Sequence, residues 1–102
     1  MGNFVTIGQA SDIGEGELKR VEAAGARIAI ANVAGTFYAL GDTCTHLGCS
    51  LSRGELEKTL VICPCHGSIF DVTSGKVRRG PAKKPEPTYR VEVRDGSLWI
   101  EV

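Results

Sequence analysis

The chain has 102 residues, and 12 lysine and arginine residues balance 12 aspartate and glutamate residues. This length fits one domain, and zero net charge argues against a protein whose main role is to coat nucleic acid. The 42% hydrophobic and 24% charged fractions are typical of a folded globular chain. The longest apolar run, residues 28–34, is too short to cross a membrane, and the N-terminus lacks a secretory signal pattern. We therefore expect a soluble, cytoplasmic protein without a membrane anchor.

Short β-type segments separated by glycine turns make up the N-terminal part. A first strand is indicated by Phe4, Val5 and Ile7. Residues 26–33 then alternate, and the candidates for their inward face are Ile28, Ile30 and Val33. The sequence Ala34-Gly35-Thr36 predicts a hairpin turn into a strand over residues 37–40.

The C-terminal part follows the same pattern. Tyr89, Val91 and Val93 share one face of a predicted strand, and Asp95-Gly96 predicts a tight turn. After the turn, one face of the last strand is expected to carry Leu98, Ile100 and Val102, and the other Trp99 and Glu101. Short strands at this spacing predict an all-β fold, an antiparallel sandwich or partly open barrel.

The middle of the chain differs from both ends, because residues 43–75 hold all four cysteines and both histidines. Within it, residues 59–62 could form a strand, and Ser74-Gly75 could form a turn. Three prolines in residues 80–87 exclude a regular strand there. We expect that segment to be an ordered loop that runs back toward the middle region.

Two boxes carry the chemistry: Cys44-Thr-His46-Leu-Gly-Cys49 and Cys63-Pro-Cys65-His66-Gly-Ser68. Cysteine and histidine at this density indicate a metal, a disulfide or both. Two cysteines and two histidines would satisfy one zinc ion, so a structural zinc module, which would be colourless, is one alternative. However, each box supplies both residue types, and that division fits an iron–sulfur cluster with two inequivalent irons.

The boxes resemble the Rieske iron–sulfur family, whose pattern is Cys-x-His followed by Cys-x-x-His; here 16 residues separate His46 from Cys63. The resemblance covers the chain and implies a single domain over residues 1–102 with the Rieske fold. In that fold an all-β base, residues 1–42 and 83–102, carries an inserted cluster-binding subdomain at about 43–82. By resemblance, one iron of a [2Fe–2S] cluster is bound by Cys44 and Cys63 and the other by His46 and His66, while Cys49 and Cys65 match a disulfide pair.

The resemblance also assigns roles around the cluster. Apolar cover would come from Leu47 and Pro64, close backbone approach from Gly48 and Gly67, and a loop over a third side from Gly80, Pro81 and Ala82. Ser68 stands where high-potential members have a serine that donates a hydrogen bond to a cluster sulfur. Phe70 stands where they have a tyrosine, and it cannot donate. We therefore expect an intermediate-to-high reduction potential.

A basic stretch follows the second box without an intervening acid: Lys76, Arg78, Arg79, Lys83 and Lys84. Such a run can be an ordinary solvated face. It can also be a docking surface for an acidic redox partner, because opposite charges speed encounter.

The resemblance implies a ferredoxin: a monomeric one-electron carrier, not itself an enzyme, that passes electrons from a reductase to an oxygenase or similar acceptor and binds no nucleic acid. A second hypothesis is a cytochrome bc-type respiratory subunit or its soluble fragment, in which His66 or His46 would take a proton from a quinol. A third is the small subunit of an assimilatory nitrite reductase.

Overall fold

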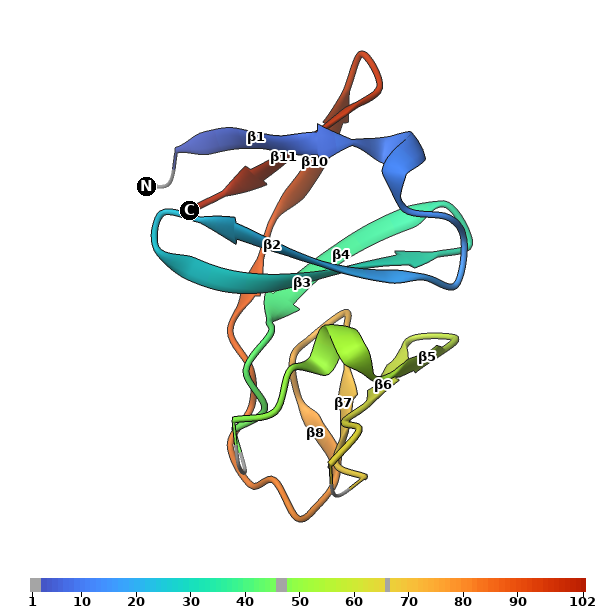
Figure 1. Ribbon diagram of the computed structural model, residues 1–102, viewed down its shortest axis with the longest axis vertical. Helices are drawn as coiled ribbons and strands as arrows, with labels where there is room; N and C mark the ends of the chain where they lie inside the picture. Colours follow the sequence, from blue (N-terminus) through green and yellow to red (C-terminus); the bar gives the residue numbers. More distant parts are fainter. Residues whose placement is uncertain (1–2, 46–47, 66) are drawn as a thin grey trace.

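The computed structural model describes residues 3–45, 48–65 and 67–102, which form three antiparallel sheets (Figure 1). The first sheet has the order β1 (Phe4–Gln9), β11 (Ser97–Glu101) and β10 (Val91–Arg94). The second has the order β2 (Leu18–Ala23), β3 (Ala26–Val33), β4 (Thr36–Gly41) and β9 (Thr88–Tyr89). The third, called the small sheet below, has the order β5 (Glu55–Glu57), β6 (Leu60–Ile62), β7 (Ile69–Asp71) and β8 (Val77–Arg79). Two short 3₁₀ helices are η1 (Ala10–Asp12) and η2 (Leu51–Arg53).

The first two sheets form the base of the molecule. They contact each other at two places, where β1 meets β2 and where β10 meets β4. The small sheet lies at the end of the molecule away from β1, β10 and β11 (Figure 1). The prediction of an all-β, antiparallel fold is therefore confirmed. Within the described residues, no helix has the length and apolar character needed to span a membrane.

Strand β3 is buried on both faces and separates two cores. Its isoleucines face the barrel core, which consists of Ile13, Ala23, Ile28, Ile30, Ala39, Leu98 and Ile100. Its alanines face the second core, which consists of Ala29, Ala31, Leu40, Cys44, Leu51, Val61, Cys63, Phe70, Val72 and Ala82. Val33 packs against the second core, so its expected place beside Ile28 and Ile30 is wrong. The two-residue period of a strand puts Val33 on the face of Ala29 and Ala31.

The predicted C-terminal strand is divided in the structure. Its first part, β9, pairs with β4, whereas β10 pairs with β11. Val93 is 51% exposed on the edge strand β10. The predicted turn at Asp95 and Gly96 is present, with φ of 49° and 79°, and Leu98 and Ile100, which were predicted to share a face, are both buried.

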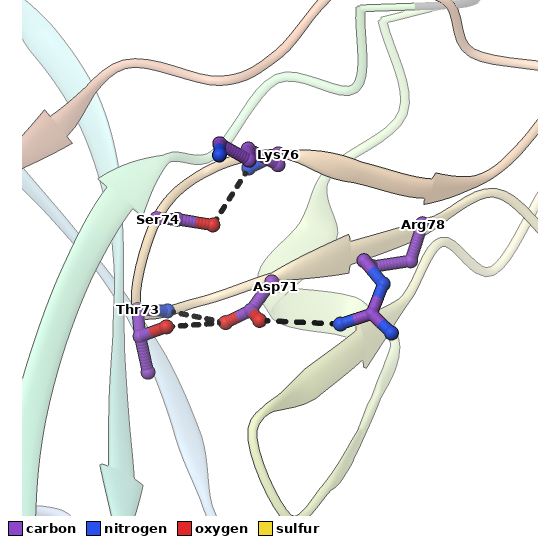
Figure 2. Close-up of polar contacts among 5 residues, drawn as sticks. All are labelled: Asp71, Thr73, Ser74, Lys76 and Arg78. Carbon is purple, nitrogen blue, oxygen red and sulfur yellow. Dashed lines mark hydrogen bonds and ion pairs between the residues drawn. The ribbon is translucent and has the colours of Figure 1, made fainter.

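The turn between β7 and β8 is organised by the Asp71 carboxylate (Figure 2). It accepts hydrogen bonds from the Thr73 hydroxyl at 2.6 Å and the Thr73 N–H at 2.9 Å, and it pairs with Arg78 at 3.5 Å. The Thr73 hydroxyl has the largest influence on the pKa of Asp71. Together with the Thr73 N–H and Arg78, it lowers that pKa below its ordinary value of 3.8 against the opposing effect of burial. Asp71 thus fixes the hairpin that carries Phe70 into the second core.

The substitution Asp71→Ala should lower the free energy of unfolding by about 1–3 kcal/mol, because it removes two short hydrogen bonds that close the turn. Arg78→Ala should cost less than about 1 kcal/mol, because that ion pair is solvent-exposed. Urea denaturation followed by circular dichroism measures both. Equal losses in the two variants would show that the ion pair, rather than the turn, determines the effect.

Candidate metal centre

The first cysteine box forms a loop, residues 44–49, whose ends are held together by backbone hydrogen bonds. An antiparallel bridge between Thr43 and Ser50 closes the loop. The Cys44 N–H donates to the Cys49 carbonyl at 2.7 Å, and the Gly48 N–H donates to the Cys44 carbonyl at 2.8 Å. Gly48 has φ of 78°, a conformation that favours glycine. The chain therefore closes on itself between Cys44 and Cys49, within the box.

The second box forms a loop of the same design, residues 63–68. The pair Ile62 and Ile69, in β6 and β7, closes it. The Cys63 N–H donates to the Ser68 carbonyl at 2.7 Å, and the Gly67 N–H donates to the Cys63 carbonyl at 3.2 Å. Gly67 has φ of 77°, nearly the value at Gly48. Both loops thus begin with a cysteine whose own N–H and carbonyl are used to close the turn.

The four cysteines fall into two kinds in the structure. Cys49 and Cys65 form a disulfide between the two loops, with their Cα atoms 6.4 Å apart. Cys44 and Cys63 are outside the disulfide, and they are 3% and 2% exposed in the second core. The structure therefore joins the two loops covalently and buries one thiol from each loop in a shared core. The predicted ligands His46 and His66, and the predicted cover residue Leu47, lie outside the described residues.

A third segment, residues 80–84, is bonded to both loops. The buried Ala82 N–H donates to the hydroxyl of Ser68 at 3.0 Å, and Ser68 is fully buried. The Thr45 hydroxyl donates to the Lys84 carbonyl at 2.7 Å. Gly80 and Pro81, at the start of this segment, are exposed. The structure thus brings the proline segment, the second box and the first box together.

Two other predicted site residues occupy contrasting positions. Phe70 is fully buried in the second core, whereas Pro64 is exposed in the second loop. The phenyl ring of Phe70 packs the core that holds Cys44 and Cys63.

Two buried acids beside the first loop were missed by sequence reasoning. Asp42, which is 1% exposed, accepts hydrogen bonds from the Ser50 hydroxyl and, at 2.7 Å, from the Ser52 N–H. Glu86 is 6% exposed, and burial raises its pKa to about 7. The nearby Thr45 N–H opposes that rise in pKa, and the charge of Asp42 adds to it. The one sequence signal at Glu86 was an acid between two prolines in a basic segment.

The arrangement suits an iron–sulfur cluster. Thiols bind iron as thiolates, and two buried thiols on closed, cross-linked loops supply soft ligands at fixed positions. The imidazoles within the same two boxes would supply nitrogen ligands of the kind that distinguish a Rieske cluster from an all-cysteine one. The residues present therefore fit a cluster held between the two loops.

Comparison with known proteins also indicates an iron–sulfur protein. Residues 3–90 match the model of the Rieske [2Fe-2S] domain. The chain is 39% identical over 98 residues to ferredoxin CarAc of Metapseudomonas resinovorans, covering 95% of this chain and 92% of that protein. It is also 39% identical over 93 residues to the 3-phenylpropionate/cinnamic acid dioxygenase ferredoxin subunit of Escherichia coli K12, covering 90% and 87% of the two chains.

Solved structures agree with these relatives. A ferredoxin of Sphingomonas yanoikuyae B1 superimposes with a TM-score of 0.92 at 30% identity, covering 98% of this chain and 99% of that one. A ferredoxin chain in a complex of reduced oxygenase and oxidized ferredoxin in carbazole 1,9a-dioxygenase gives a TM-score of 0.91 at 36% identity, covering 96% and 92%. The chain therefore belongs to the Rieske [2Fe–2S] domain family, and it is an electron-transfer protein that holds a Rieske-type [2Fe–2S] cluster.

Proposed function

We propose that this chain is a cytoplasmic ferredoxin that accepts one electron from a reductase and passes it to an oxygenase or similar acceptor. The observation that carries the proposal is the pair of equivalently built loops, which bury Cys44 and Cys63 and are joined by the disulfide. The relatives named above are ferredoxins and ferredoxin subunits, which favours this function over a respiratory subunit.

The same proposal assigns the ligands. Cys44 and Cys63 hold one iron, and His46 and His66 hold the other. The bound cluster supplies a one-electron site, and neutral imidazoles in place of thiolates make reduction more favourable. We also propose a single domain in which residues 1–42 and 83–102 form the base, and about 43–82 form the cluster-binding part. The division between the two base sheets and the small sheet supports these boundaries.

The variants Cys44→Ser and Cys63→Ser should both lose the cluster, because each removes an iron ligand from a buried position. The double variant Cys49→Ser/Cys65→Ser should assemble the cluster but lose it faster on exposure to EDTA, because it lacks the cross-link between the loops. Visible absorption and iron content measure the outcome. A wild-type protein that is colourless, or that takes up zinc in place of iron, would refute the proposed function.

Ser68 supports the proposal of an intermediate-to-high reduction potential. Its oxygen accepts the hydrogen bond from Ala82, so its own O–H can donate to a second partner. A donor aimed at a cluster sulfur favours the more negative, reduced state. Phe70 supplies no such donor, so the proposed potential stays below that of members with both groups.

Ser68→Ala should lower the midpoint potential by on the order of 100 mV, the equivalent of one hydrogen bond to a charged group. Ser74→Ala is the matched control, because the Ser74 hydroxyl accepts a hydrogen bond from Lys76 on the exposed β7–β8 turn (Figure 2). Its potential should equal that of the wild type. An unchanged potential in Ser68→Ala would show that this hydroxyl does not donate to the cluster.

We further propose that the basic residues beside the cluster form the docking surface for an acidic face of the redox partner. All five residues of the stretch are exposed. Lys83 and Lys84, together with Thr45 and Pro81, line a hollow of 410 Å³ against the first loop. Arg78, in contrast, is paired with Asp71. The lysine pair is therefore the part of the basic stretch best placed to act on a partner near the cluster.

The double variant Lys83→Glu/Lys84→Glu should slow oxidation of the reduced protein by anionic ferricyanide about tenfold at low ionic strength, and accelerate oxidation by hexaammineruthenium(III). Added salt should reduce both differences. Lys19→Glu/Arg20→Glu, on β2 in the base, makes the same change in net charge and should leave both rates near those of the wild type. Equal effects of the two double variants would contradict a local docking surface.

A further inference from the structure

Glu86 is buried although it carries a carboxyl group. It is 6% exposed, and it lies between two exposed prolines, Pro85 and Pro87. Its Oε2 atom is the buried side-chain polar atom that lacks a hydrogen-bond partner among the described residues. Burial of a carboxyl group with an unsatisfied oxygen is unfavourable. A substantial interaction of its other oxygen or its backbone must offset that cost.

Two glycines make room for this residue. Gly41 ends β4, and a Cβ atom there would press against Oε1 of Glu86 and against the ring of Pro87. Gly75 lies in the β7–β8 turn, and a Cβ atom there would overlap the Glu86 carbonyl. The Glu86 N–H donates to the Gly75 carbonyl at 2.8 Å, and the Gly41 N–H donates to the Pro87 carbonyl at 2.9 Å. Glu86 is therefore held between the base and the small sheet.

From this position Glu86 reaches the first loop. The Thr45 N–H lies close enough to its carboxyl group to oppose the rise of its pKa. The Thr45 hydroxyl donates to Lys84, two residues before Glu86, at 2.7 Å. Segment 84–86 thus holds Thr45 through both its backbone and its side chain. Thr45 is the residue between the proposed iron ligands Cys44 and His46.

We propose that Glu86 is a positioning residue for the cluster: its carboxyl group fixes the peptide that joins Cys44 to Thr45, and so sets the direction of the ligand side chains on either side. This inference rests on the proposed function, because it requires Cys44 and His46 to be iron ligands. The charge that acts on Glu86 from a neighbouring segment is that of Asp42, directly after β4, and Lys84 lies on the same segment as Glu86. A carboxylate and a carboxylic acid both offer an acceptor oxygen, so the contact to Thr45 does not need the charge.

The test compares Glu86→Gln with Glu86→Leu. Glutamine keeps an acceptor oxygen for the Thr45 N–H, so its electron paramagnetic resonance spectrum should match that of the wild type. Leucine has a similar volume but no acceptor, so its spectrum should be altered, and EDTA should remove its iron about tenfold faster. Asn32→Leu is the control for general destabilisation. Asn32 is 5% exposed in the base, where its side chain bonds to Ile13 and Gly35, so the variant should unfold more easily with an unchanged spectrum.

An unaltered spectrum in Glu86→Leu, or the same change in Asn32→Leu, would overturn the positioning role. If Glu86→Leu does not fold, amide hydrogen exchange in the wild-type protein decides the question. The Thr45 amide should then exchange slowly, and exchange at the rate of an unprotected amide would overturn the inference. A wild-type protein that binds no cluster would contradict the proposed function. A bound cluster whose spectrum and rate of iron loss do not depend on Glu86 would contradict this inference alone.

Discussion

The site depends on the burial of Cys44 and Cys63 in a core shared by the base and the small sheet. That core can form because β3 presents alanines, Ala29 and Ala31, on the face toward the cysteines, while its isoleucines fill the barrel. Small side chains on this face allow the small sheet to pack closely against the barrel. Since a close-packed interior resists displacement of its members, the two thiols are held where the packing puts them.

Next to this core, three segments are joined to one another by hydrogen bonds. The two loops are closed in the same way by their own backbone groups, and residues 80–84 bond to Thr45 in one loop and Ser68 in the other. A shift of one segment would therefore break contacts of another. A one-electron carrier benefits from such a frame, because ligands that are already in position need little rearrangement when the charge changes.

The elements predicted correctly are those with a local signal. Leu98 and Ile100 alternate with Ser97, Trp99 and Glu101 directly after a tight turn, and both are buried. Strands β5, β7 and β8 have three residues each, too few to show a period, and β2 mixes charged and apolar residues. The prediction for Val33 is wrong because both faces of β3 carry apolar residues. Alternation of apolar and polar residues therefore cannot show which of the two cores a residue of β3 faces.

The sequence by itself determined the family and predicted the ligand types, because the spacing of cysteine and histidine within two short boxes is a local property of the chain. Only the tertiary structure decided which groups support those ligands. Ala82 is hydrogen-bonded to Ser68, 14 positions away in the sequence, and Thr45 is hydrogen-bonded to Lys84, 39 positions away. Charged residues are usually exposed, and the two flanking prolines do not by themselves show that Glu86 is buried. Its burial follows from the path of the chain, which brings it between β4, the first loop and the β7–β8 turn.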